Sequence, residues 1–141
     1  MGLNILIVDD LSLMRSMIQR IIRLSGLDAG RLLFAENGAD ALHVMDAHRI
    51  DLVVTDLNMP VMDGYTMIQI MKERDILCGI PVLVVSTECG AARLETLRAQ
   101  GVAGMIQKPF APEDLVRAVK HVACAPAGSE VSTAWAPEGI N

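Results

Sequence analysis

One stretch decides the fold: it runs from Asp51 to Gly64 and reads Asp-Leu-Val-Val-Thr-Asp-Leu-Asn-Met-Pro-Val-Met-Asp-Gly. Residues 52–54 are apolar and mostly β-branched, which is typical of a strand that is buried on both faces. Pro60 and Gly64 predict a loop after this strand. Asp56 therefore lies at the carboxyl end of a buried strand, where open α/β sheets bind ligands. Taken alone, a single aspartate here is better interpreted as a loop-capping residue.

Further strands and helices are predicted on both sides of this stretch, because apolar runs alternate with segments whose apolar residues recur with a period near 3.6. We expect strands at Asn4–Val8, Arg31–Ala35, Pro81–Val85 and Gly104–Gln107, and helices at Leu11–Leu24, Gly38–Ala47, Tyr65–Arg74, Ala91–Gln100 and from Pro112 onward. The predicted fold class is α/β, a doubly wound five-stranded parallel sheet with five helices. The strand order 2-1-3-4-5 is taken from the fold class and not from the residues.

Local signals refine the first helix and the core. Ser12 is the expected N-cap of the first helix, and Gly26 is its expected stop. Four methionines at helical spacing are interpreted as core residues: Met14, Met17, Met67 and Met71.

Length and composition limit the class of protein. The 141 residues, of which 52% are hydrophobic and 21% charged, fit one compact domain at residues 1–123. Residues 124–141 are rich in Ala, Pro, Gly and Ser without periodicity, so we expect a flexible tail or a linker stub.

Charge and targeting signals argue against several partners. A formal net charge of -5 disfavours nucleic acid and anionic membranes as partners. The sequence contains neither a membrane-spanning apolar run nor a signal peptide, so we expect a cytoplasmic location. The three cysteines form no C-x-x-C pair, which predicts reduced thiols and no zinc site.

Carboxylates also follow the first predicted strand. Asp9 and Asp10 end that strand, and with the strand order above they would meet Asp56 in one crevice. Two carboxylates 4 Å apart repel by roughly 4 kcal/mol at an effective dielectric constant near 20. A hard divalent ion, most naturally Mg²⁺, would compensate this repulsion. N-capping of the first helix is the alternative interpretation of Asp9 and Asp10.

Lys108 follows the fifth predicted strand and would add a positive charge to the same crevice. Its alternative interpretation is a solvated surface lysine. Mg²⁺ and a lysine together can hold a phosphoryl group, and Asp56 can attack its phosphorus to form an acyl phosphate. The sequence has no Gly-rich nucleotide-binding loop, so the phosphoryl donor should be a small molecule or another protein.

Four motifs occur in order at strand ends: Asp9-Asp10, Thr55 to Gly64, Ser86, and Lys108-Pro109-Phe110. In this combination the sequence resembles the receiver domains of two-component response regulators, most closely the single-domain, CheY-like chemotaxis type. The resemblance covers about Leu3 to Val122 and implies a flavodoxin-like fold.

The resemblance implies that Asp56 accepts a phosphoryl group from a phosphohistidine of a sensor histidine kinase or phosphotransfer protein. It implies that Asp10, Asp56 and the Asn58 backbone carbonyl bind Mg²⁺, for which Mn²⁺ can substitute, and that Asp9 acts through a bound water. It also implies a self-modifying switch and not an enzyme that turns over other substrates.

Further roles are carried over in the same way. Lys108 would pair with the phosphoryl oxygens, the Lys108-Pro109 bond would be cis, and Ser86 would hydrogen-bond the phosphate. Met105 occupies the place of the usual switch aromatic, where it can repack but not swing as a tyrosine does. A downstream protein would bind the face made by the fourth helix, the fifth strand and the fifth helix.

Asn58 and Glu88 match the pair that flanks the attacking water in rapidly dephosphorylating relatives, so the resemblance implies a short-lived phosphorylated state. Other interpretations stay open from the sequence. The chain could be a receiver excised from a longer response regulator, or a scaffold with an inactive site. A phosphatase of the haloacid dehalogenase type is a further alternative, although that class has a D-x-D pattern where this chain has adjacent Asp9-Asp10.

Overall fold

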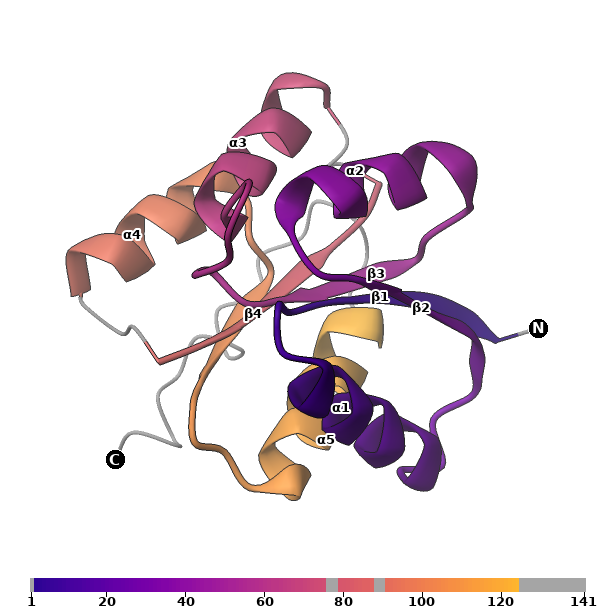
Figure 1. Ribbon diagram of the computed structural model, residues 1–141. Coiled ribbons are helices and arrows are strands. Elements are labelled where there is room, and N and C mark those ends of the chain that lie inside the picture. Colours follow the sequence, from indigo (N-terminus) through magenta and orange to yellow (C-terminus); the bar gives the residue numbers. More distant parts are fainter. Residues whose placement is uncertain (1, 76–78, 88–90, 125–141) are drawn as a thin grey trace.

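Strands and helices alternate along the computed structural model, which describes residues 2–75, 79–87 and 91–124 (Figure 1). The elements are β1 (Leu3–Val8), α1 (Ser12–Leu24), β2 (Ala29–Ala35), α2 (Gly38–Ala47), β3 (Leu52–Thr55), α3 (Gly64–Glu73), β4 (Val82–Ser86), α4 (Ala91–Gln100), β5 (Gly104–Gln107) and α5 (Pro112–Cys124). They match the predicted elements to within two residues at nearly every end. The predicted tail, from residue 125 onward, lies outside the described residues.

The five strands form one parallel sheet in the order β2-β1-β3-β4-β5, which confirms the expected topology. Helices α1 and α5 cover one face of the sheet, and α2, α3 and α4 cover the other (Figure 1). The chain changes direction across the sheet between β1 and β3, so this pair forms the topological switch point. Val8 and Thr55 are paired across it, and the residues that follow them therefore lie side by side.

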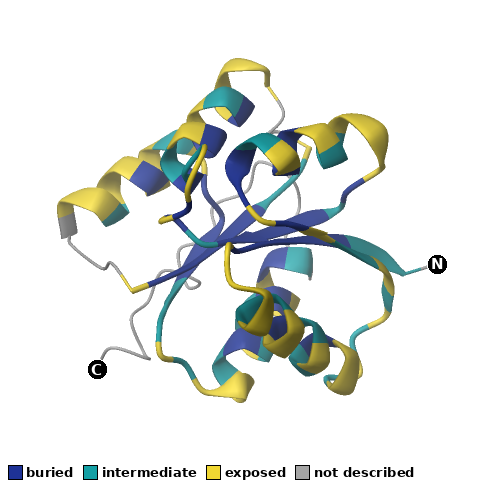
Figure 2. Ribbon diagram, viewed as in Figure 1, coloured by how far each residue is buried: buried dark blue, intermediate teal, exposed yellow. Residues whose placement is uncertain are grey.

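The core lies in two layers because successive strand residues point to opposite faces of the sheet. Leu6 and Val53 belong to the layer beneath α2, α3 and α4, while Ile5, Ile7 and Val54 belong to the layer beneath α1 and α5. The central strands are dark blue in Figure 2, whereas the outer helix surfaces are largely yellow. This burial explains why β1, β3 and β4 appear in the sequence as continuous apolar runs.

Helix α1 begins differently from the prediction. Leu11, and not Ser12, is the N-cap, and it has no side-chain cap hydrogen bond. The backbone N–H of Leu11 instead donates to Oδ1 of Asp9 at 3.0 Å, so a carboxylate of the strand end fixes the turn into the helix. Gly26 ends the helical segment with φ at +83°, as predicted.

The methionine prediction is correct for α3 and wrong for one residue of α1. Met67 and Met71 are fully buried, but Met17 is 41% exposed. Helix α1 packs through Ile18 and Ile22, and Met17 lies about 100° around the helix from Ile18.

Among the described residues, no helix is long and apolar enough to cross a membrane.

Candidate functional site

The carboxyl edge of the sheet gathers acidic side chains from two neighbouring strands. Asp9 and Asp10 follow β1, Asp56 follows β3, and the backbone N–H of Asp56 donates to the Val8 carbonyl at 2.9 Å. Each of the three side chains offers a carboxylate oxygen, and these oxygens all lie within 4.8 Å of one another. The structure therefore brings together the three acidic residues that the sequence places at the ends of two strands.

The three carboxylates differ in their access to water. Asp9 is buried, Asp56 is largely covered, and Asp10 is exposed. The acidic group thus opens to solvent on the side of Asp10. A reactant can approach from that side without disturbing the core.

Lys108 connects two of these carboxylates from across the sheet. Its Nζ lies 3.0 Å from Oδ2 of Asp9 and 3.5 Å from Oδ2 of Asp56, and its side chain is only 12% exposed. The backbone N–H of Lys108 donates to the Ser86 carbonyl at 2.8 Å, which fixes the end of β5 against β4. The Lys108-Pro109 peptide bond is cis, as the resemblance led us to expect.

Asp56 is held in place by the backbone on both sides. Its Oδ1 accepts a hydrogen bond from the Leu57 N–H at 2.7 Å, and its carbonyl oxygen accepts one from Thr55 Oγ1 at 2.8 Å. Gly64 packs so close to Asp56 that a Cβ atom at position 64 would clash with the Asp56 carbonyl oxygen. The orientation of the carboxylate is therefore determined by strand and loop, before any ligand binds.

Burial raises the pKa of Asp56, and this is the largest influence on that carboxyl. The ammonium of Lys108 and the amides of Leu57 and Asn58 act to lower the pKa, while the charge of Asp9 acts to raise it further. The ionised form of Asp56 is therefore costly, and an additional cation beside it would stabilise that form.

The donor set fits a hard divalent cation such as Mg²⁺. It consists of carboxylate oxygens at one solvent-accessible edge, without histidine or thiolate, and Mg²⁺ prefers such oxygen ligands and retains several waters. Manganese accepts the same ligands. Asn58 is exposed next to Asp56 and could add its backbone carbonyl.

The other predicted site residues lie in different environments. Ser86 ends β4 and is buried. Met105 lies on β5 opposite Val84 and is mostly buried in the layer that also contains Leu97 of α4. Glu88 lies outside the described residues.

Two features were missed in the sequence. Arg15 Nη1 donates to the backbone carbonyl of Asp9 at 2.6 Å, so α1 holds the main chain of the acidic pair from six residues away. No signal in the sequence links these two residues. Met62 N–H donates to the Pro60 carbonyl at 2.7 Å, and Val61 between them has φ at +68°, which forms a tight turn in the loop after Asp56.

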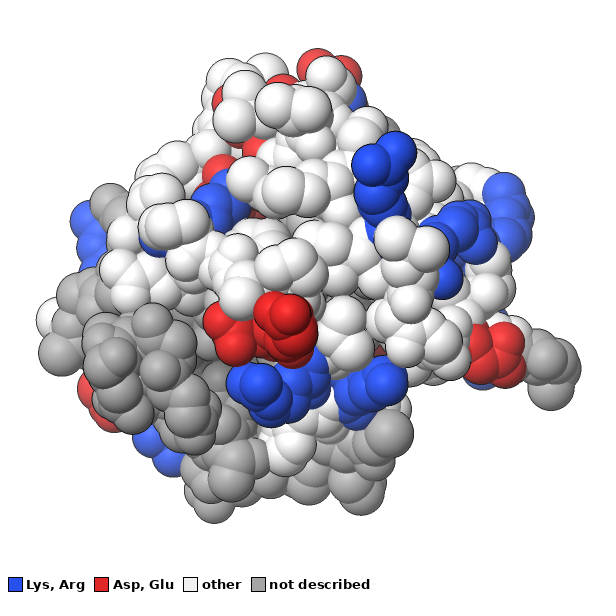
Figure 3. Space-filling view, turned by 90° about the horizontal axis from the view of Figure 1, so that it is seen from below, with Lys and Arg blue, Asp and Glu red and all other residues white. Residues whose placement is uncertain are grey.

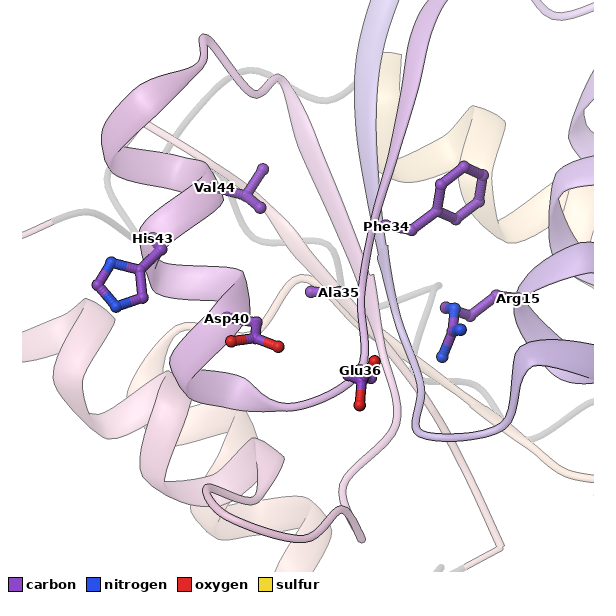
Figure 4. Close-up of a pocket in the computed structure, with 7 residues that line it drawn as sticks. All are labelled: Arg15, Phe34, Ala35, Glu36, Asp40, His43 and Val44. Carbon is purple, nitrogen blue, oxygen red and sulfur yellow. The ribbon is translucent and has the colours of Figure 1, made fainter.

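A hollow of about 390 Å³ lies beside the end of β2 (Figure 4). Side chains from α1, the end of β2 and α2 surround it, namely Arg15, Phe34, Ala35, Glu36, Asp40, His43 and Val44. It shares none of the predicted site residues. Arg15 connects it to the acidic group through the Asp9 carbonyl.

Comparisons with known proteins agree with this geometry. The sequence model of the response regulator receiver domain matches residues 5–120. The chain is 35% identical over 114 residues to the chemotaxis protein CheY1 of Helicobacter pylori, which covers 80% of this chain and 90% of that protein. It is 32% identical over 120 residues to the chemotaxis protein CheY of Pseudomonas aeruginosa, with 85% and 95% covered. Among solved structures, the chemotaxis response regulator CheY4 of Vibrio cholerae superposes with a TM-score of 0.77 at 28% identity, covering 86% of this chain and 99% of that one.

Proposed function

This chain belongs to the response regulator receiver domain family, and on that premise we propose that Asp56 is its phosphoacceptor. It is a CheY-like receiver of a two-component phosphorelay. One observation carries the assignment of Asp56: it is the carboxylate that shares the Lys108 ammonium with Asp9 while lying at the edge of the crevice. Asp10 is more exposed and Asp9 is buried, so Asp56 combines access with a fixed orientation.

In the proposed reaction, a carboxylate oxygen of Asp56 forms a bond to the phosphorus of a phosphohistidine. The P–N bond of the donor breaks, and its electron pair stays on the imidazole nitrogen. Lys108 lies within 3.5 Å of the Asp56 carboxylate, so its ammonium can follow the phosphoryl oxygens as their charge develops. The product is an acyl phosphate, which water later cleaves to inorganic phosphate and the free carboxylate.

We assign the metal ligands to Asp10, Asp56 and the Asn58 carbonyl, with Asp9 acting through a water. Mg²⁺, or Mn²⁺ in its place, would neutralise phosphoryl oxygens in the crevice. Asp9 is the least suited to direct coordination, because its Oδ1 already accepts from Leu11 N–H and its Oδ2 faces Lys108.

Phosphorylation adds up to about two negative charges beside Lys108, at the end of the β5 strand. We propose that Ser86 and Lys108 contact the phosphate and that Met105 repacks beneath α4 in response. This would shift a pre-existing equilibrium of the face formed by α4, β5 and α5, where a downstream protein would bind. Asn58 and Glu88 would then set the rate at which water removes the phosphate.

The remaining assignments follow from this switch function. The receiver would span residues 1–123, in line with the family match to residues 5–120. The protein would act in the cytoplasm, and its upstream partner would be a sensor histidine kinase or a phosphotransfer protein. This protein would catalyse only its own phosphorylation and dephosphorylation. We expect neither nucleic acid nor a membrane among its partners.

Labelling with a small phosphodonor tests this function without the unknown kinase. Wild type and Asp56→Asn are incubated with phosphoramidate, with Mg²⁺ or with EDTA, and their intact masses are measured. We expect a single acid-stable, base-labile phosphoryl adduct on the wild type with Mg²⁺ and none on Asp56→Asn. Equal labelling of both proteins would contradict the assignment, and labelling that is independent of Mg²⁺ would contradict the metal site.

A further inference from the structure

A groove of about 610 Å³ separates α1 from α5 on the face of the sheet away from α2, α3 and α4. Its lining residues come from the second half of α1, the C-cap of that helix and the first two-thirds of α5: Arg20, Ile21, Leu24, Ser25, Pro112, Glu113, Val116, Arg117 and Lys120. Most of its surface is hydrocarbon, because the aliphatic stems of the arginines and the lysine flank the apolar side chains. None of the acidic residues gathered at the carboxyl edge lines this groove.

Leu24 is the most exposed apolar side chain of this groove. It is 80% exposed at the last position of α1, while Ile21 one turn earlier is partly buried. A leucine in this position exposes apolar surface to water, and a ligand could cover that surface.

The rim of the groove is mainly positive. Arg20, Arg117 and Lys120 are its cations, against the single carboxylate of Glu113. Arg117 pairs with Asp114 at 3.2 Å, whereas Arg20 and Lys120 make no ion pair with any described residue. Figure 3, which views the molecule from the side of α1 and α5, shows blue side chains on this face, some next to white surface and some directly beside red side chains. An acidic segment with apolar side chains would complement such a groove.

The chain itself contains a segment with this character. Residues 125–141 follow α5 and carry Glu130 and Glu138 but no lysine, arginine or histidine. The same segment holds Trp135, the only tryptophan of the protein, together with Val131 and Ile140. We propose that residues 125–141 occupy the groove between α1 and α5, with Trp135 packed against Leu24 and the glutamates facing Arg20 and Lys120.

The tether makes this contact easy to reach. Lys120 is one helical turn before Cys124, where α5 ends, and Trp135 follows eleven residues later. Eleven residues extend to roughly 35 Å, which is longer than α5 itself. A short flexible connection gives an effective concentration of about millimolar, so even a weak contact would be populated. The proposal depends on the fold alone and not on the chemistry of Asp56.

Trp135 provides the test, because its fluorescence reports only on this segment. We compare the full-length wild type, Leu24→Glu and Leu13→Glu by emission maximum and by acrylamide quenching, and we confirm folding by circular dichroism. Leu13 is a matched control, since it is 82% exposed on the same helix but does not line the groove. We expect Trp135 in the wild type and in Leu13→Glu to emit at shorter wavelength, and to be quenched about twofold less, than in the urea-unfolded chain. Leu24→Glu should remove both differences.

Three results would overturn the proposal. Wild-type emission and quenching equal to those of the unfolded chain would show that the segment is not docked. Protection that survives Leu24→Glu would place Trp135 elsewhere. Protection that disappears on dilution, together with a dimer in size-exclusion chromatography, would mean that the groove is occupied by a second copy. Nuclear Overhauser contacts between the Trp135 indole and the Leu24 methyl groups in the monomer would support the proposal directly.

Discussion

The ammonium of Lys108 lies 3.5 Å from the carboxylate of Asp56, although their strands, β5 and β3, are separated by β4 in the sheet. The same ammonium is 3.0 Å from Asp9. Three carboxylates and one lysine leave a formal charge of two negative units at this edge (three minus one). A divalent cation restores neutrality, and a phosphoryl group can then bind where both positive charges meet.

Replacing Lys108 should destabilise the metal-free protein. Lys108→Met leaves the buried carboxylate of Asp9 without its partner, and such a loss costs about 3 kcal/mol of unfolding free energy. Urea denaturation in EDTA measures it, and Mg²⁺ should recover part of the loss. The control is Lys72→Met on exposed surface, which should change stability by less than about 0.5 kcal/mol. Equal effects of the two substitutions would mean that the Lys108 contact contributes little.

Asp56→Asn should stabilise the metal-free protein at neutral pH. Burial raises the pKa of Asp56 in the folded state, so the folded protein loses stability as the pH rises from the unfolded value, 3.8, through the raised folded value. The asparagine has no charge and avoids this loss, while its amide oxygen can still accept from Leu57 N–H. Thermal unfolding at several pH values in EDTA should show a gain at pH 7 that shrinks toward pH 4. A gain that grows as the pH falls would contradict the direction of the pKa shift.

Asp10→Asn should weaken Mg²⁺ binding while leaving the fold unchanged. Asp10 is exposed at the open side of the acidic group, so its substitution removes a ligand and no packing. We expect at least about a tenfold rise in the Kd for Mg²⁺, equivalent to about 1.4 kcal/mol, in isothermal titration calorimetry. Asp46→Asn, an exposed carboxylate on α2, is the control and should bind Mg²⁺ as the wild type does. An unchanged Kd for Asp10→Asn would remove Asp10 from the ligand set.

Val61→Asn should stabilise the protein. Val61 has φ at +68° and is 85% exposed, so its β-branched side chain costs backbone strain and contributes little burial. Asparagine tolerates this conformation, and we expect a gain of about 1 kcal/mol in urea denaturation with an unchanged slope. Val61→Thr keeps the branch at Cβ and should give no gain. A gain from threonine as large as that from asparagine would show that polarity, and not strain, is responsible.

The sequence predicts the architecture well because the signals that define it are local. The apolar runs of β1, β3 and β4 are continuous since both faces of these strands are covered, and Gly26 ends the first helical segment by its backbone conformation. The strand order depends on pairing between distant segments, so it could be predicted only from the fold class and not from the residues. Ser12 is predicted as the N-cap from its residue type, whereas Leu11 is the N-cap and the Asp9 side chain accepts from the Leu11 N–H two residues later. The capping role that the sequence left open for Asp9 is closer to what the structure shows.

The candidate site likewise contains residues that the sequence identifies and residues that it does not. The sequence identifies four site residues because each lies one or two residues after a strand, and the ends of parallel strands share one edge: Asp9, Asp10, Asp56 and Lys108. Arg15 could not be identified from the sequence, because it donates to a backbone carbonyl. Every residue has such a carbonyl, so no residue type in the sequence indicates the contact. Met17 was misplaced since a helical period identifies an apolar stripe but not its edges.

The position of the phosphoryl group tests the central claim most directly. The wild type is labelled with phosphoramidate and Mg²⁺, the acyl phosphate is trapped by reduction with borohydride, and tandem mass spectrometry of its peptides locates the modified residue. The account predicts modification of Asp56 alone. Modification of Asp9, Asp10 or a histidine in its place would contradict it.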